Sequence, residues 1–125
     1  MLDWVVVERR GSSKMTFYLR GMIGEELLSV SFLKDSVELE FTSLTVVANT
    51  EMYFRDEKRN ILSNKPGWRD AVCSLISQFV DEAAQSFDDL ILSFGESGTL
   101  RFSLRSRDVK GDFAVRFAIE PWELR

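Results

Sequence analysis

The sequence predicts an α+β fold, a mainly antiparallel sheet or a partly open barrel that is built from two related halves and covered in part by one amphipathic helix. Residues 21–46 and 74–102 repeat one strand-turn-strand pattern 53 positions apart, so that Asp35 matches Asp88 and Phe41 matches Phe94. Apolar and polar residues alternate along several short segments, which is typical of strands with one buried face. A single segment has helical periodicity instead.

The strands are expected in chain order. Leu2 to Glu8 and Met15 to Arg20 flank a Gly-Ser-Ser-Lys turn and predict an N-terminal hairpin. Lys34 and Asp35 form the turn of the next hairpin. Further strands are predicted over residues 27–33, 36–41, 44–48, 52–55, 87–94, 100–105 and 113–119. The polar segment from Asp56 to Pro66 is expected to be an exposed loop.

One amphipathic helix is predicted from Gly67 to Phe79. Its apolar residues fall at helical spacing, and polar residues take the other side. The apolar set is Trp68, Val72, Leu75, Ile76 and Phe79. We expect Trp68 to close the sheet edge against the helix, and we expect Cys73, which has no basic neighbour in sequence, to be a buried and inert thiol.

Composition limits the function. The chain of 125 residues has the length of one domain, which we assign to 1–125. It has no histidine and one cysteine, so catalytic triads, Cys-His pairs and zinc sites of the usual ligands are excluded. We expect no catalytic residue, no cofactor and no metal. The N-terminus lacks a signal-type pattern and no apolar run is long enough for a membrane helix, so we expect a cytoplasmic protein, of bacterial type, that does not contact membranes.

The charge is uneven along the chain. Residues 21–60 carry eight acids against four bases, and residues 61–100 carry six against two. An acidic centre disfavours nucleic acid, because neutralising phosphates supplies most of that affinity. It suits a basic protein partner. The sequence therefore predicts a protein-binding surface.

The residues predicted to bind this partner are Glu38, Glu40, Asp56 and Glu57. Glu38 and Glu40 alternate with apolar residues, which places both on the wet face of one strand. The alternative for this set is an ordinary solvated sheet face. Two rival functions also stay open, namely a carboxylate- or metal-dependent enzyme that uses Asp88 and Asp89, and a homo-oligomer joined through exposed strand edges.

The helix segment carries a resemblance. Pro-Gly-Trp-Arg-Asp-Ala-Val-Cys-Ser-Leu-Ile, residues 66–76, resembles a group of small uncharacterised bacterial proteins whose helix opens with a Gly-aromatic-Arg-Asp-Ala segment and which have a Trp near the C-terminus, as Trp122 is here. Ser77 stands where that group has Gly. The resemblance implies no activity. A weaker likeness in size, acidity and lack of catalytic groups is to immunity proteins, which neutralise bacterial toxins, and it implies a cognate basic toxin, such as a nuclease, as the partner.

Overall fold

The computed structural model describes residues 3–7 and 19–119 of the chain. The strands are β1 (Asp3–Val7), β2 (Leu27–Phe32), β3 (Val37–Phe41), β4 (Leu44–Ala48), β5 (Met52–Arg55), β6 (Asn60–Leu62), β7 (Glu82–Gln85), β8 (Asp89–Ser93), β9 (Thr99–Ser103) and β10 (Val115–Ile119). The helix α2 spans Trp68–Cys73, and two short 3₁₀ helices, η1 and η2, span Gly95–Ser97 and Ser106–Asp108. Residues 19–22 are also helical.

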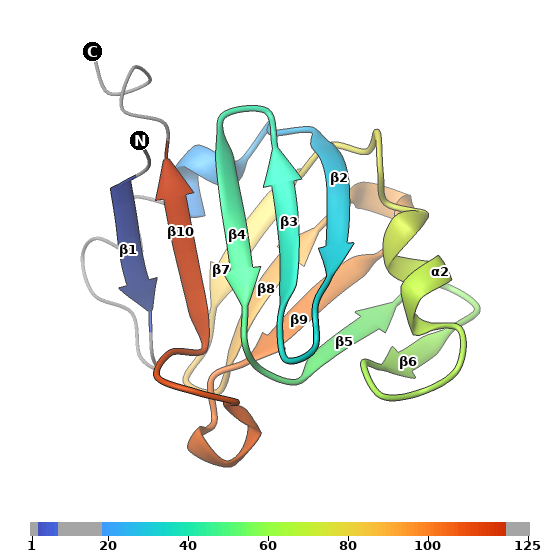
Figure 1. Ribbon diagram of the computed structural model, residues 1–125. Coiled ribbons are helices and arrows are strands. Elements are labelled where there is room, and N and C mark those ends of the chain that lie inside the picture. Colours follow the sequence, from blue (N-terminus) through green and yellow to red (C-terminus); the bar gives the residue numbers. More distant parts are fainter. Residues whose placement is uncertain (1–2, 8–18, 120–125) are drawn as a thin grey trace.

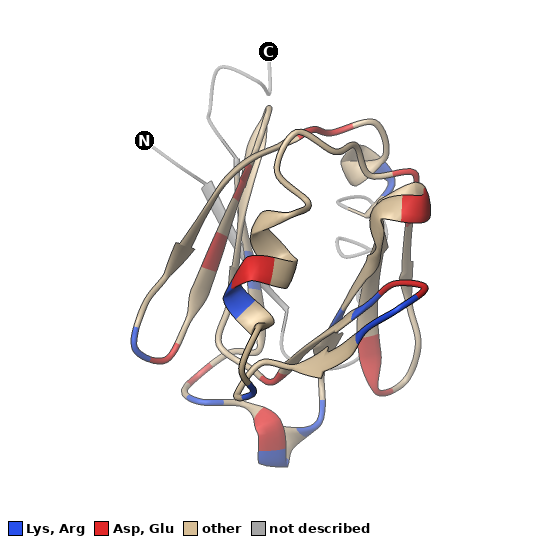
Figure 2. Ribbon diagram, turned by 90° about the vertical axis from the view of Figure 1, so that its right-hand side faces the viewer, with Lys and Arg blue, Asp and Glu red and all other residues tan. Residues whose placement is uncertain are grey.

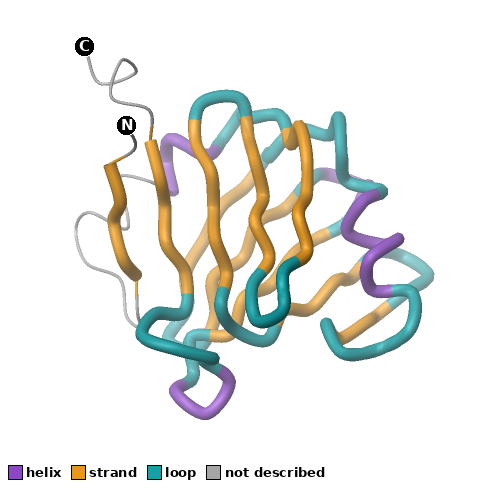
Figure 3. The backbone as a smooth tube through the Cα atoms, viewed as in Figure 1, coloured by secondary structure: helices purple, strands orange, loops and turns teal. Residues whose placement is uncertain are grey.

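The strands form two five-stranded layers (Figure 1), which confirms the sheet-rich, mainly antiparallel fold. The first sheet has the order β1-β10-β4-β3-β2, and the second has the order β6-β5-β9-β8-β7. The sequence left one sheet and a partly open barrel as alternatives. The described strands form two separate sheets, so the prediction of one sheet is wrong, and the strands do not close into a barrel. The tube trace in Figure 3 shows the same two layers, with α2 at one side of them.

The core lies between the two sheets. Side chains that alternate with more accessible ones along strands such as β5, β8 and β9 meet there, and the core includes the completely buried Phe54, Phe102 and Phe117. The rings of Phe41 and Phe94, which match one another in the sequence repeat, stack with their centroids 6.4 Å apart. Burial of this much apolar surface is the main contribution to stability.

The repeated segments take the same local conformation in different sheets. The first forms the β2-β3-β4 meander, and the second forms β7-β8-β9. Val30 pairs with Leu39 in the first, and Ala83 pairs with Leu92 at the matching positions of the second.

Hydrogen bonds between the two segments come in matching pairs. The Gly24 amide donates to the Val80 carbonyl (2.7 Å), and 53 positions on, the Ser77 amide donates to the Leu27 carbonyl (2.8 Å). The isolated bridge between Glu26 and Phe79 joins two positions that are themselves 53 apart. These contacts connect the start of β2 to the segment that precedes β7.

Each meander continues into the opposite sheet. After β4 the chain crosses over, so that β5 pairs with β9, and after β9 it crosses back, so that β10 pairs with β4. Glu38 and Glu40 on β3 lie in a different sheet from Arg101 on β9.

The predicted N-terminal hairpin is wrong for those of its residues that the structure describes. β1 pairs with β10, for example Val5 with Phe117, and residues 19–20 are helical instead of extended. The remainder of the predicted second strand lies outside the described residues, as does Trp122. Pairing across most of the chain length leaves no local pattern in the sequence, whereas hairpin turns do.

The helix is shorter than predicted. α2 ends at Cys73, and the following turn leads to Ser77, the one non-glycine residue with positive φ among those described (φ +77°). A left-handed residue ends helical hydrogen bonding, so Phe79 lies beyond the helix and is 58% exposed. Trp68 is buried as expected. Cys73 is exposed, which corrects the prediction, because the adjacent Ala71 and Val72 take the buried side of the helix.

Two strands were not predicted. β6 lies within the segment expected to be a loop, and β7, with the sequence Glu-Ala-Ala-Gln, has residues of low strand propensity. Both are edge strands, and each is extended because it pairs with the one strand beside it.

Ser77 provides a test of backbone strain. It occupies the position that matches Gly24, whose φ is +90°. A left-handed conformation costs a non-glycine residue about 1–2 kcal/mol, and the flexibility of glycine in the unfolded chain offsets part of this. We expect Ser77→Gly to raise the free energy of unfolding by about 0.5–1 kcal/mol in urea titration.

The matched control is Gly24→Ser. A Cβ there meets no atom within 4 Å, so the substitution adds backbone strain without a clash, and stability should fall by a similar amount. Unchanged or reduced stability of Ser77→Gly would contradict the expectation.

Candidate functional site

Glu38 and Glu40 lie on the outer face of β3, as the sequence predicts. Leu39 between them is completely buried, so both carboxylates point away from the core. Across the sheet they face small or apolar neighbours, because Glu38 pairs with Ser31 and Val47. The Ser29 hydroxyl donates a hydrogen bond to Glu40 Oε1 (2.9 Å). Neither carboxylate has an ion pair with a basic side chain in the part of the chain that the structure describes.

Asp56 and Glu57 lie in the turn between β5 and β6. Asp56 Oδ1 accepts hydrogen bonds from the Lys58 and Arg59 amides (2.9 and 2.7 Å), and Oδ2 accepts from Arg59 Nη2 (2.9 Å). The hydrogen bond from the Arg59 side chain, followed by that from the Lys58 amide, holds the pKa of the Asp56 carboxyl below its usual value. The carboxylate of Asp56 therefore forms its hydrogen bonds within its own turn, and Glu57 is the exposed acid of this pair.

The four predicted residues form two separate groups. β3 belongs to the first sheet, and the β5–β6 turn belongs to the second. In the view of Figure 2, acidic and basic positions are interspersed over both layers and the helix. The structure brings Glu38 together with Glu40, and Asp56 with Glu57, but it does not bring the two pairs together.

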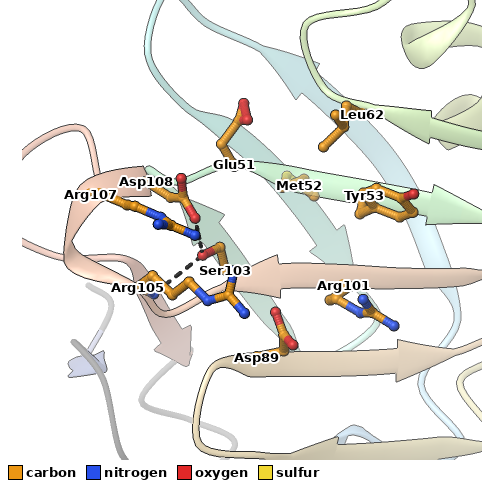
Figure 4. A pocket seen from close by; sticks show the side chains of 10 residues that line it. All are labelled: Glu51, Met52, Tyr53, Leu62, Asp89, Arg101, Ser103, Arg105, Arg107 and Asp108. Carbon is orange, nitrogen blue, oxygen red and sulfur yellow. Dashed lines mark hydrogen bonds between the residues drawn. The ribbon is translucent and has the colours of Figure 1, made fainter.

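Two adjoining hollows that the sequence did not predict lie on the outer face of the second sheet. The first, shown in Figure 4, has a volume of about 310 Å³. Its lining comes from β5 and the residue before it, from β6, β8 and β9, and from the residues that follow β9. The lining residues are Glu51, Met52, Tyr53, Leu62, Asp89, Arg101, Ser103, Arg105, Arg107 and Asp108.

The second hollow has a volume of about 390 Å³ and shares Tyr53 and Arg101 with the first. It extends to the β5–β6 turn and to η1, so it includes Asp56 and Glu57 from the predicted set and adds Glu96. The alternation of arginine with apolar residues along β9 was the one sequence signal for this face. The turn and η1 join it only through the fold.

The three arginines of the first hollow have different surroundings. The guanidinium carbon of Arg101 lies 5.7 Å from the centre of the Tyr53 ring, a cation–π distance. Arg105 Nη2 lies 3.3 Å from Asp88 Oδ2, and this hydrogen bond raises the pKa of Arg105. In Figure 4 the Arg107 side chain lies beside Asp108, whose Oδ2 accepts a hydrogen bond from Ser103 Oγ (2.6 Å).

The carboxylates of the rival enzyme hypothesis are divided in the structure. Asp88 is paired with Arg105, whereas Asp89 lines the first hollow. Within the described ranges, no three His, Cys, Asp or Glu side chains lie together in a way that could hold a metal ion.

Comparison with protein families, curated proteins and solved structures finds no match to this chain. Among the residues described, no helix has the length and apolar character needed to cross a membrane.

Proposed function

We propose that the chain is a non-enzymatic protein-binding module, and in its most concrete form a bacterial immunity protein that binds and neutralises a cognate basic toxin such as a nuclease. The observation that carries the proposal is the Glu38–Glu40 pair, two outward carboxylates on one strand without a basic partner among the described residues. The cytoplasm is the expected compartment for such a protein.

The geometry of the pair supports a docking role. Residues two apart in a strand are separated by about 7 Å, so the two negative charges repel each other in the free protein. Positively charged groups on a partner would relieve this repulsion. An exposed ion pair contributes only about 0–1 kcal/mol, so the main effect is expected on the rate and specificity of association.

Charge reversal tests the role of this face. Glu38→Lys combined with Glu40→Lys should slow association with the partner by about tenfold or more at low salt, because electrostatic steering is lost, while the unfolding transition stays intact. Stopped-flow or surface-based kinetics at several salt concentrations would measure the on-rate.

The matched control reverses two exposed acids on the other sheet. Asp81→Lys with Glu82→Lys changes the net charge equally but leaves β3 unaltered. If both double variants slow association equally at every salt concentration, net charge alone accounts for the effect and the β3 face has no special role.

The toxin partner can be sought among the products of neighbouring genes. Growth of cells that produce the candidate toxin domain should be restored by this chain and restored less well by the Glu38→Lys, Glu40→Lys variant. Failure of the chain to relieve toxicity, or full protection by the variant, would contradict the immunity proposal with the β3 face as its binding surface.

We also propose that the fold consists of two related halves and that short helical segments cover the open sides between the sheets. The proposal is supported by the shared register of the two meanders, the paired hydrogen bonds 53 positions apart and the positive φ of both Gly24 and Ser77. α2 contacts both β2 and β5, which lie in different sheets, and residues 19–22 match 72–75 of the second half.

A further inference from the structure

A third hollow lies where the β2–β3 turn, the start of α2 and the connection between β9 and β10 meet. Buried or half-buried apolar side chains form part of its lining, namely Phe32, Val37, Ala48 and Trp68. Its volume is about 130 Å³. Pockets that enclose drug-sized molecules have volumes of about 300–1,000 Å³, so this hollow suits a single small group.

The charge of this hollow differs from that of the two hollows on the second sheet. The first hollow is lined by three basic and three acidic residues, and the second by two basic and three acidic residues. The third is lined by three basic residues, Lys34, Arg69 and Lys110, and by one acid, Asp35. It therefore has an excess of two positive charges in a chain whose net charge is −4.

None of these three basic side chains is neutralised by an acid. All three are exposed, and none forms an ion pair with a described residue. Asp35 forms none either, although it lines the same hollow. Glu51, which accepts a hydrogen bond from a serine that lines this hollow, belongs to the lining of the first hollow. Three like charges around one hollow repel each other, and a bound anion would remove this repulsion.

Arg69 presents its hydrogen-bond donors in a restrained orientation. Its guanidinium carbon lies 5.2 Å from the centre of the Phe32 ring, a cation–π distance. Stacking on a ring occupies one face of the guanidinium and leaves the N–H groups at its edge available. This edge can donate two parallel hydrogen bonds to a phosphate or a carboxylate. Arg69 is therefore suited to bind an oxyanion in this hollow.

The β2–β3 turn adds a neutral donor. Ser36 is half-buried and lines the hollow. Its carbonyl oxygen accepts a hydrogen bond from the Leu33 amide (2.8 Å), whereas its hydroxyl forms no hydrogen bond with the described residues. A hydroxyl, a guanidinium and two ammonium groups can together satisfy the oxygens of a tetrahedral anion.

The basic side chain of this turn is not needed for the strand-turn-strand structure. In the second half of the repeat, Phe87 stands at the position of Lys34, and Asp89 stands at the position of Ser36. The turn from β7 to β8 therefore forms without a basic residue. The fold does not account for the positive charge of Lys34, whereas a binding role would.

We propose that this hollow binds a phosphate group in its dianionic form, with Arg69, Lys34 and Lys110 as the residues that contact its oxygens. A phosphate monoester carries about −1.5 to −2 charges at pH 7, which matches the excess of two positive charges. A carboxylate or a phosphodiester carries one negative charge and would leave part of the excess unbalanced. The site goes beyond the proposed protein-binding function and includes neither Glu38 nor Glu40.

A titration with inorganic phosphate tests the site on the full ¹⁵N-labelled chain. At about pH 8, where phosphate is mainly dianionic, the amide signals of Ser36, Arg69 and Lys110 should shift and saturate. The expected dissociation constant is in the millimolar range, because exposed ion pairs contribute little each. Sulfate, a dianion of the same shape, should bind comparably. Dimethyl phosphate, a monoanion, should bind about threefold more weakly or less, and chloride at equal ionic strength should cause no saturable shift.

Substitutions of single charges predict effects of opposite sign. Arg69→Gln and Lys110→Gln should each weaken phosphate binding by about two- to fivefold, the range for an exposed ion pair. Asp35→Asn should strengthen it by about twofold, because the one acid of the lining is removed. The matched control is Lys58→Gln, at an exposed lysine of the β5–β6 turn that does not line this hollow, and its phosphate affinity should be unchanged.

A phosphoserine peptide, acetyl-Ala-phosphoserine-Ala-amide, distinguishes two sources of the phosphate group. Tighter binding of the peptide than of inorganic phosphate would assign the site to a phosphorylated side chain of another protein, and tighter binding of inorganic phosphate would assign it to the free anion. Either result supports the site.

Three results would overturn the phosphate site. They are equal affinity for inorganic phosphate and dimethyl phosphate, unchanged affinity in both Arg69→Gln and Lys110→Gln, and an equal loss of affinity in Lys58→Gln. Circular dichroism of each variant checks that the fold is retained. None of these results depends on whether reversal of Glu38 and Glu40 slows association with a protein partner, so the two proposals can fail separately.

Discussion

Replacing Phe54 by alanine is expected to lower the free energy of unfolding by about 3–5 kcal/mol. Phe54 on β5 is completely buried, and its ring lies in the core between the sheets. The loss combines the transfer free energy of the ring with the cost of a cavity that the rigid strands cannot close. Single domains are stable by about 5–15 kcal/mol, so the variant should unfold at clearly lower urea concentration.

The control for this substitution is Phe79→Ala, the same chemical change at a side chain that is 58% exposed. Its effect should stay within about 1 kcal/mol, because little buried area is lost. Equal losses for the two variants would show that the ring of Phe54 is not in the core. Chemical denaturation with fluorescence and circular dichroism as separate probes measures both.

Replacing Gly98 by alanine is the second substitution with a large expected effect, a loss of about 2–4 kcal/mol. Gly98 precedes β9 with φ +142° and ψ 177°, a conformation that is essentially restricted to glycine. A Cβ there would lie 2.9 Å from two ring carbons of Phe54 and 3.2 Å from the Arg55 carbonyl oxygen. Strain and overlap therefore act together, and neither neighbour is the free end of a flexible side chain.

Gly21→Ala is the matched control. Residue 21 is helical and exposed, and a Cβ there meets nothing within 4 Å. Alanine is favoured over glycine in helices by up to about 1 kcal/mol, so this variant should be unchanged or slightly more stable.

The two large effects should be coupled. In the double variant Phe54→Ala, Gly98→Ala, the ring that obstructs the new Cβ is absent. The loss of unfolding free energy in the double variant should therefore be smaller than the sum of the two single-variant losses by about 1–2 kcal/mol. Additive losses would mean that backbone strain, and not contact with Phe54, limits the Gly98 variant.

Alternation and turn residues made part of the fold predictable. Leu39 and Leu92 lie at apolar positions flanked by polar ones, and both are completely buried, because a strand with period-two alternation can bury only one face. The same signal placed Glu38 and Glu40 on the outside. Turn residues such as Lys34 and Asp35 marked the turn that connects β2 to β3.

Other elements left no local signal. The short strand β7 has a sequence that favours helix as much as strand, and its extended conformation comes from pairing with β8. The end of α2 was missed because the apolar spacing continues to Phe79, whereas Ser77 takes a left-handed conformation in order to hydrogen-bond to Leu27 of β2. In both cases a contact with a distant segment outweighs the local pattern.

The candidate site, like the fold, was predictable from the sequence only in part. The outward direction of Glu57 in a polar turn and of Arg101 in an alternating strand was readable from the chain. Their shared hollow was not, because it requires β5 to leave the first sheet and pair with β9.

Local spacing in the sequence, over residues two to four positions apart, sets which side of each regular strand is apolar and where most turns fall. The tertiary structure alone decided that the repeated segments lie in opposite sheets and exchange β5 and β10 between them. The physical reason is that each meander has one apolar face, and the two faces are removed from water only when they are packed against each other. That arrangement divides the predicted acidic residues between two surfaces.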